Sequence, residues 1–482
     1  MEITRLLRTI KTHHPQADLD LVRLAYDFAE EAHRGQKRLS GEDYVTHSLA
    51  TAQTLAEMKF SAAIVIAGLL HDVPEDTSVT LEDIKKNFGS DIAGMIQGVT
   101  KLGKIKYRGL ERYIENLRKM FLAMAEDVRV VFIKFADRLH NLETLDALPP
   151  QKRLRVALES LEIYAAIANR LGMGDIKGRI EDLSFKYVYP EEYAWVTGLV
   201  RERYVEKERY LRRTGKIVER ELSAAGITPI SVYGRTKHLY SLYKKLLRYD
   251  RDIARIYDLV ALRIIVKNVA DCYAALGIIH ARWKPLKGRI KDYIAQPKPN
   301  GYQSLHTTIF CEGGEVVEIQ IRTERMHEES EMGVAAHWTY DEGGKGSAQP
   351  PQNLRWAQEL LKIQKELGKS DDALESLQEL KIDVFQNRIF AFTPKGDVID
   401  LPEDSTPVDF AYAIHSDIGD SCVGSRVNDQ LVPLSTPLRS GDVVQIITDK
   451  NRRAPSQDWL AFVKTQGARS KIKARVRKAR RG

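Results

Sequence analysis

Cysteine is scarce in this sequence, and long apolar runs are missing. The three cysteines, Cys272, Cys311 and Cys422, lie far apart and form no C-x-x-C pair, which disfavours a zinc or redox site and favours reduced, buried thiols. No stretch of about 18 consecutive apolar residues occurs, and residues 1–10 carry two arginines but no apolar run, so we expect a soluble cytoplasmic protein without a membrane span. No repeat of fixed period is found, which argues against a solenoid.

Length and charge narrow the class of protein further. A chain of 482 residues predicts about three domains, and 43% hydrophobic with 29% charged residues is typical of globular proteins. The net charge of +8 resides in the tail, because residues 450–482 contain twelve Lys or Arg and a single acid, Asp458. This tail could bind phosphates, or it could be a solvated helix end; both interpretations stay open.

The periodicity of apolar residues predicts two different regions in the first 340 residues. From Leu19 to about Trp195 nearly every segment has helical periodicity, which indicates an all-helical region. After a charged helix at 201–222, short β-branched runs at 259–266 and 316–321 alternate with helices. We therefore predict that a mixed α/β domain follows, with its first strands after Ala225.

A connector and a small module follow. Gly and Pro residues at 341–351 are typical of a flexible linker, and a polar helix runs through Leu380. A hairpin at 389–401, a short helix and a strand at 442–448 predict a β-grasp module. The predicted divisions are an all-helical domain at 1–195, an α/β domain at 196–340, a linker and helix at 341–383, a β-grasp domain at 384–450 and a basic tail at 451–482.

A set of polar residues in the helical region is a candidate metal site. Asp137 lies in an otherwise apolar helical stretch and needs a partner, and an apolar run ends at a histidine and an aspartate. The candidate ligands are His47, His71, Asp72 and Asp137. Two imidazoles and two carboxylates suit Mn²⁺, Zn²⁺ or Fe²⁺ with open positions, where a bound water would be the nucleophile. A single His-Asp pair alone would be ordinary surface polarity.

The order of these ligands resembles that of the HD phosphohydrolases. The segments HDVPEDT at 71–77 and FADRLHN at 135–141 resemble their RelA/SpoT branch. The resemblance implies an all-helical HD fold, Mn²⁺ as the metal and removal of the 3′-pyrophosphate from (p)ppGpp, with Glu75 and Asp76 activating or orienting the attacking water. The positions that would hold the nucleotide are Arg38, Asn141 and Thr144. Two positions depart from the family: Pro74, which biases Val73 away from helix, and Glu143, where the family usually has arginine.

A basic segment of the α/β region is a candidate phosphate site. The segment starts at Gly234 and predicts a helix with Arg235 and Lys237 at its N-terminus, where backbone N–H groups attract phosphate. One face of this helix would carry Lys237, Ser241, Lys245 and Arg248. A solvated basic face is the alternative interpretation.

Two strands and a loop add carboxylates and an aromatic ring. Alternation along 316–322 puts Glu318 on the polar face of one strand, and Asp258 precedes the other. Glu318 and Asp258 on neighbouring strand positions could share Mg²⁺. Tyr302, in a loop rich in Pro and Gly, offers a flat face for a purine, although a core tyrosine is an equal alternative.

Four motifs in this order resemble the (p)ppGpp synthetase domain of the RelA/SpoT family: GRTK at 234–237, YDLVALR at 257–263, NGYQSLH at 300–306 and VEIQIRT at 317–323. The resemblance implies a nucleotidyltransferase-like fold in which the 3′-hydroxyl of GDP or GTP attacks the β-phosphorus of ATP and AMP leaves. The implied ATP-phosphate residues are Arg235, Lys237, Ser241 and Lys245. Asp258 and Glu318 would hold Mg²⁺, Glu318 could also accept the hydroxyl proton, and Tyr302 would stack on guanine. Further substrate-binding positions are Arg263, Lys298, Asn300, His306 and Gln320.

Residues 385–449 resemble the TGS module of the same family. This resemblance implies contact with the ribosome and places His415 near the 3′ end of uncharged tRNA, whereas the residues alone favour a packed or surface histidine. Long members continue past this module, so we expect this chain to be a shortened form. The R-x-K-D sequence at 289–292 is the form that accompanies bifunctional members.

Three functions stay open on sequence grounds. The favoured one is a bifunctional enzyme that makes and hydrolyses (p)ppGpp, because both sets of site residues are complete. The others are a hydrolase with an inactive synthetase relic, and a ribosome- or tRNA-binding protein whose sites only sense nucleotide.

Overall fold

The computed structural model forms two compact units, residues 1–364 and 365–482. It describes residues 2–103, 119–120, 122–124, 126–256, 258–298, 300–336, 388–395, 397–439, 441–449 and 454–479. The predicted linker and polar helix at 341–383 lie outside the described residues, as do both ends of the basic tail. Within the described parts, no helix is long and apolar enough to cross a membrane.

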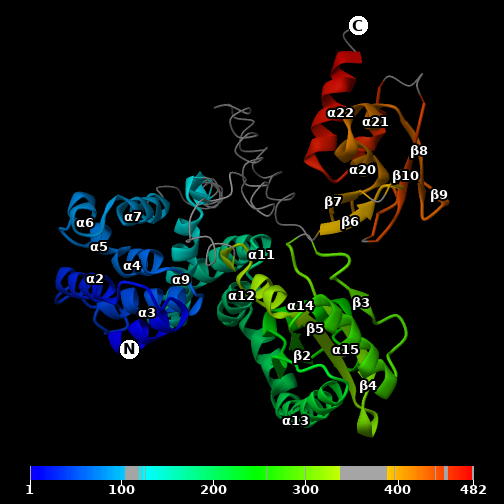
Figure 1. The fold of residues 1–482 in the computed structure, drawn as a ribbon. Coiled ribbons are helices and arrows are strands. Elements are labelled where there is room, and N and C mark those ends of the chain that lie inside the picture. Colours follow the sequence, from blue (N-terminus) through cyan, green and yellow to red (C-terminus); the bar gives the residue numbers. More distant parts are fainter. Residues whose placement is uncertain are drawn as a thin grey trace. The chain divides into compact units, whose positions relative to one another are not determined.

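The first unit opens with helices, as the periodicity predicts (Figure 1). The helix α4 (Ala62–Leu70) is apolar throughout and packs against α2, α3, α7 and α9, so it forms the centre of this bundle. The elements are α1 (Ile3–His13), α2 (Leu19–Ala32), α3 (Val45–Glu57), α5 (Val73–Asp76), α6 (Leu81–Phe88), α7 (Ser90–Gly103), α9 (Arg129–Glu143), η1 (Leu145–Ala147), α10 (Pro150–Glu159), η2 (Ser160–Tyr164), α11 (Ala165–Arg170) and α12 (Gly174–Val188).

One local expectation in this bundle is wrong. Val73 is not kept out of helix by Pro74; it opens the four-residue helix α5 instead. Proline is tolerated in the first turn of a helix because its missing N–H group would have no partner there. The turn therefore carries Glu75 and Asp76 on a short helix directly after His71 and Asp72.

The charged helix predicted at 201–222 is longer than expected. The helix α13 (Pro190–Ala224) begins at a proline and runs unbroken through residue 195. It packs against α12 of the helical bundle and against α14, β1, β2 and α15 of the α/β region. One continuous helix thus connects the two regions of the first unit.

The α/β region contains a five-stranded sheet in the order β1-β2-β5-β4-β3. The pair β2 and β5 is parallel, and the other neighbouring pairs are antiparallel. The helices α13 and α15 cover one face, where Val317, Ile319 and Ile321 of β5 are buried in the core, as alternation predicts. The elements are β1 (Ser231–Thr236), α14 (Leu239–Arg248), η3 (Ile253–Arg255), β2 (Val260–Val266), α15 (Val269–Arg282), β3 (Lys291–Asp292), β4 (Leu305–Phe310), η4 (Glu312–Gly314), β5 (Val316–Thr323) and α16 (Glu324–Met332).

The helix predicted to start at Gly234 is placed wrongly. Residues 231–236 form the edge strand β1, which pairs with β2, and the helix α14 begins only at Leu239. Arg235 therefore lies on a strand, and Lys237 lies between strand and helix instead of on the helical face with Ser241. The pairing with β2 outweighs the local helical pattern, because strand propensity depends mainly on the neighbouring strand.

The second unit has the predicted β-grasp topology. The hairpin of β6 (Arg388–Phe392) and β7 (Val398–Pro402) is joined by a parallel bridge, Phe392 to Val443, to the sheet β10-β8-β9. The described part of the tail packs on this module, since Trp459 and Ile472 share a core with Val408. The other elements are α20 (Pro407–Ile414), α21 (Ser416–Asp420), β8 (Cys422–Val427), β9 (Gln430–Val432), β10 (Val444–Thr448), η7 (Gln457–Ala461) and α22 (Gln466–Ala479). All three cysteines of the chain are buried thiols, as predicted.

Candidate functional site

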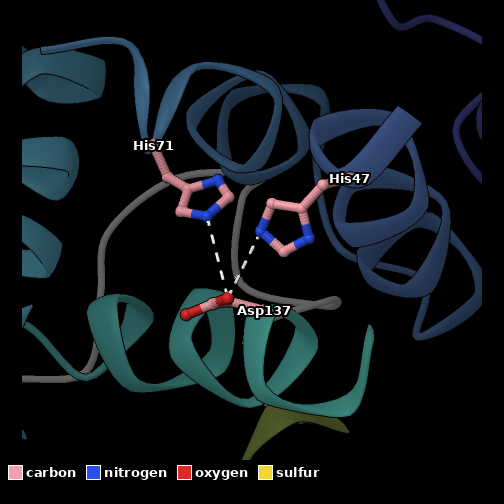
Figure 2. Close-up of side chains that lie close together, drawn as sticks. All are labelled: His47, His71 and Asp137. Atoms are coloured by element: carbon pink, nitrogen blue, oxygen red, sulfur yellow. Dashed lines mark ion pairs between the residues drawn. The ribbon is translucent and has the colours of Figure 1, made fainter. Parts of the chain in front are cut away.

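The predicted metal ligands converge between α3, the end of α4 and α9. Figure 2 shows the imidazoles of His47 and His71 pointing at one oxygen of Asp137. His47 Nε2 lies 3.3 Å and His71 Nε2 4.0 Å from Asp137 Oδ1, and all three side chains are buried. Asp72 approaches both histidines, at 3.2 Å from His71 Nε2 and 3.4 Å from His47 Nε2. The structure therefore brings all four residues together.

Both histidines use Nδ1 for a hydrogen bond, so Nε2 is the atom that could bind a metal. His71 Nδ1 lies 2.9 Å from the carbonyl oxygen of Gly68 and donates to it. His47 Nδ1 lies 2.8 Å from His140 Nδ1, which also accepts from Arg38 Nη1 at 2.9 Å and is therefore unprotonated, and burial lowers the pKa of His140 to about 3. Among the described residues, the buried Nε2 of His71 has no hydrogen-bond partner. An unbonded imidazole nitrogen facing two carboxylates suits a divalent metal ion.

The surrounding charges keep the carboxylates ionised. Burial alone would raise the pKa of Asp137, but the Lys134 ammonium, 2.6 Å away, and the two histidines hold that pKa well below its ordinary value. Glu75 is different, because burial raises its pKa. Asp76 accepts a hydrogen bond of 2.6 Å from the Tyr44 hydroxyl, which also donates to Asp72 at 3.0 Å.

Sequence reasoning missed His140, Lys134 and Tyr44 in this centre. His140 and Lys134 each lie three residues from Asp137 on α9, which is the spacing of one helical face. Tyr44 precedes His47 by three residues. That spacing from the predicted ligands was the signal that could have found all three.

A cavity of about 470 Å³ opens beside Asp137. Its lining includes the basic residues Lys37, Arg38, Lys134, Arg138, Lys152 and Arg155, together with Asn141 and Thr144. Arg38 donates to Asn141 Oδ1 at 2.6 Å, so the three predicted nucleotide-holding residues face one cavity. Glu143, the residue at the family's arginine position, pairs with Arg179 of α12 at 3.2 Å.

The second candidate site gathers around Asp258, directly before β2. Lys237 Nζ lies 2.8 Å and Lys245 Nζ 2.7 Å from its carboxylate. Burial would raise the pKa of Asp258, but the two ammonium groups lower it to about 2. A carboxylate and two cations from three segments thus meet at the edge of the sheet.

Glu318 lies on the polar face of β5, but its position relative to Asp258 was predicted inaccurately. The strand register pairs Glu318 with Ala261, three residues after Asp258. Glu318 accepts from Gln320 Nε2 at 2.9 Å and lies 3.3 Å from His306 Nδ1. Burial and the charge of Asp258 raise the pKa of Glu318, but the hydrogen bond and charge of His306, together with the hydrogen bond from Gln320, hold that pKa below its ordinary value.

The loop before β4 places the ammonium group of Lys298 over the rings of Tyr293 and Tyr302. Lys298 Nζ lies 4.6 Å from the centre of the Tyr293 ring and 5.0 Å from that of Tyr302. The loss of water around this ammonium lowers the pKa of Lys298 to about 8. The Tyr302 hydroxyl lies 2.8 Å from His306 Nε2, and Asn300 Oδ1 accepts from the Tyr302 backbone N–H at 3.3 Å.

The remaining predicted residues have protein partners. Arg263 is buried and lies 2.7 Å from Glu331. Ser241 donates to Glu181 of α12 at 3.3 Å. Arg235 stands opposite Ala261 in the register of β1 and β2. In the second unit, His415 ends α20 with an exposed side chain and accepts from the Asp417 N–H at 3.2 Å.

Family models match three parts of the chain: an HD domain at residues 25–174, a region found in RelA / SpoT proteins at 234–345 and a TGS domain at 389–448. These matches coincide with the helical bundle, the α/β region and the β-grasp module. They bear out the fold classes that the sequence predicts for the three regions.

Curated relatives match nearly the whole chain. A GTP pyrophosphokinase from Myxococcus xanthus is 45% identical over 477 residues, which is 98% of this chain and 62% of the relative, so the chain spans less than two thirds of that protein. A guanosine-3′,5′-bis(diphosphate) 3′-pyrophosphohydrolase from Aquifex aeolicus is 46% identical over 98% of this chain and 67% of its own length. A bifunctional (p)ppGpp synthase/hydrolase SpoT from Escherichia coli K12 is 46% identical over 99% of this chain and 67% of its own. The chain belongs to the RelA/SpoT family.

Proposed function

We propose that this chain both makes and destroys (p)ppGpp. One site transfers pyrophosphate from ATP to the 3′-hydroxyl of GDP or GTP, and the other removes the 3′-pyrophosphate again. The names of the relatives, which include a pyrophosphokinase, a pyrophosphohydrolase and a bifunctional enzyme, support this proposal.

The observation that carries the proposal is the metal-type cluster opening onto a cationic cavity. Asp137 belongs to both, as it faces the two histidines and lines the cavity of about 470 Å³. A cavity of this charge suits a guanosine with phosphates on both ribose ends, because like-signed walls concentrate a ligand of opposite charge. Arg38, Asn141 and Thr144 would hold the nucleotide.

The four ligands would hold Mn²⁺ in the hydrolase site. A bound divalent cation supplies Lewis-acid activation of water and of the phosphate. The chain's own contribution is proton transfer and orientation. Glu75, whose pKa burial raises, suits exchange of a proton with the attacking water, whereas Asp76 is oriented by the Tyr44 hydroxyl.

In the synthetase site, Asp258 and Glu318 would hold Mg²⁺. Lys237 and Lys245, which already reach Asp258, would bind ATP phosphates together with Arg235 and Ser241. Catalysis in phosphoryl transfer rests mainly on positioning and charge neutralisation, and Glu318 would accept the hydroxyl proton. Tyr302 would stack on guanine, with Arg263, Lys298, Asn300, His306 and Gln320 around the two nucleotides.

The β-grasp unit would bind the ribosome and uncharged tRNA. The TGS match and the exposed side chain of His415 support this assignment. A cytoplasmic location, where these partners and nucleotides are found, completes the proposal.

Two incubations test the proposed function. With ATP, GDP and Mg²⁺ the protein should form (p)ppGpp, and with ppGpp and Mn²⁺ it should release pyrophosphate. Asp258→Ala should abolish only synthesis, and His71→Ala only hydrolysis. If either substitution silenced both reactions in a folded protein, the two-site assignment would be wrong. Hydrolysis without synthesis in the wild type would instead indicate an inactive relic, and binding without turnover a sensor.

A further inference from the structure

The corner between β1 and α14, residues 237–240, is held by a helix of the hydrolase region. Asp182 of α12 accepts a hydrogen bond from the Tyr240 backbone N–H at 3.0 Å through Oδ1. Its other oxygen, Oδ2, lies 2.8 Å from His238 Nδ1. One carboxylate therefore contacts two residues of a corner that lies 56 to 58 residues further along the chain.

Asp182 acts as the N-terminal cap of α14. The first residues of a helix have backbone N–H groups without intrahelical partners, and a side-chain oxygen normally accepts from one of them. His238, the residue before α14, makes no such hydrogen bond with its side chain. Asp182 supplies the acceptor from another helix, and its negative charge also suits the positive end of the helix dipole.

Two further contacts fix the same corner. The His238 ring lies so close to Gly178 of α12 that a Cβ atom there would be 2.2 Å from His238 Nε2. The Tyr204 hydroxyl of α13 donates to the carbonyl oxygen of Lys237 at 3.0 Å. The corner is thus clamped from α12 on one side and from α13 on the other.

The corner joins the residues proposed to bind ATP phosphates. Arg235 and Lys237 precede or open it, and Ser241 and Lys245 follow it on α14. Lys237 and Lys245 meet at Asp258, which requires a fixed path of the chain between them. A shift of α14 against β1 would separate these groups.

We propose that Asp182 is a positioning residue for ATP in pyrophosphate transfer, acting through the corner at residues 237–240. The inference rests on the proposed synthetase function but concerns a residue outside its substrate contacts. Asp182 lies on α12, which packs against α9, α10 and α11, so the helical region supplies a part of the proposed synthetase site.

The test measures the affinity for α,β-methylene ATP, which cannot donate pyrophosphate, together with the KM values of synthesis. Asp182→Ala should weaken analogue binding and raise the KM for ATP by about ten- to a hundredfold, as misplaced binding groups do. The KM for GDP and the rate of ppGpp hydrolysis should stay within about twofold of the wild type. Asp182 directly contacts neither the residues proposed to bind GDP nor those of the proposed hydrolase site. Asp182→Asn keeps an oxygen for the Tyr240 N–H and should restore most of the affinity.

A matched control separates positioning from loss of stability. Asn268 accepts from the Asp271 N–H and caps α15. This helix packs on the same sheet and carries none of the proposed site residues. Asn268→Ala removes a cap of similar strength and should leave the affinity for the analogue unchanged. Gly178→Ala, one helical turn before Asp182 on α12, displaces the His238 ring and should weaken analogue binding as Asp182→Ala does.

Wild-type affinity for the analogue in folded Asp182→Ala, or an equal loss in Asn268→Ala, would overturn the positioning role. The proposed synthetase function fails differently: the wild type would bind the analogue but form no (p)ppGpp from ATP and GDP. Because binding is measured without turnover, each result refers to one proposal only.

Discussion

Replacing Glu331 by glutamine should strongly destabilise the synthetase region, because this carboxylate neutralises two buried arginines. Its Oε1 lies 2.7 Å from Arg263 Nη1 and 3.0 Å from Arg322 Nη2. The two guanidinium side chains are only 4% and 0% exposed, so water cannot replace the lost charge. Both Nε atoms already lack a hydrogen-bond partner among the described residues.

The structure sets the size of the effect. Removing one partner of a buried ion pair costs about 3–5 kcal/mol, and glutamine keeps one acceptor, so we expect about 3 kcal/mol. Burial would raise the pKa of Glu331, but Arg263 and Arg322 lower it below the ordinary glutamate value. The carboxylate therefore stabilises the fold fully above the pKa of an unfolded glutamate, and this contribution is lost as the pH falls through the lowered folded pKa. The measurement belongs at pH 7.

Urea unfolding followed by tryptophan fluorescence is a suitable assay. The sequence has no tryptophan before Trp195, so the signal excludes the first helices of the bundle, and Trp283 is buried in the synthetase core. A loss of about 3 kcal/mol should lower the midpoint by about 1 M or more. The control is Glu329→Gln on the same helix, where the partner Arg325 is 83% exposed and the pair contributes about 0–1 kcal/mol. Equal shifts for both variants would refute the reasoning from burial.

Three further predictions follow from individual contacts. Asp137→Asn should abolish retention of about one Mn²⁺ per chain after dialysis, measured by elemental analysis, while synthesis persists; full retention would exclude Asp137 as a ligand. The KM for GDP should rise as the pH passes about 8, where Lys298 loses its charge, and Lys298→Arg should remove this rise; an unchanged profile would separate Lys298 from phosphate binding. Asp409→Ala removes a buried acceptor for the backbone N–H groups of Thr406, Lys464 and Thr465. Hydrogen exchange in α22 should therefore accelerate by a hundredfold or more, which corresponds to about 3 kcal/mol. Unchanged exchange would show that Asp409 does not hold the tail.

The architecture followed from the sequence where a pattern had one strong interpretation. The strands β2 and β5 were predicted because their apolar runs are β-branched, and the structure buries both runs; their parallel pairing was not predicted. The candidate ligands His71 and Asp137 were recognised because a polar residue ends or interrupts an apolar helical run. Both signals lie in short stretches of sequence, and both indicate which side chains are buried.

The failures lie where tertiary contacts decide the conformation. The segment from Gly234 has a helical pattern, but its first residues pair with β2 as a strand. Asp182 of α12 then caps α14, the helix that follows. Asp182 could not be recognised from its surroundings in the sequence, because its partners lie in another region. The role of Glu331 could not be predicted either, because in the sequence it is an ordinary charged residue of a helix. Its role depends on Arg263 of β2 and Arg322 of β5, which both pair with it in the structure.

The two proposed metal sites should differ in whether an ion can bind without nucleotide. In the histidine cluster, His71 Nε2 is unbonded and two carboxylates face the histidines, against a single ammonium, that of Lys134, so the cluster would suit an ion before any substrate arrives. At Asp258, two ammonium groups already neutralise one carboxylate and repel a further cation. Mg²⁺ would join this site more favourably together with a polyanion whose phosphates bind the two lysines. The proposed synthetase site would therefore need ATP to complete its metal site, whereas the proposed hydrolase site would bind its metal without nucleotide.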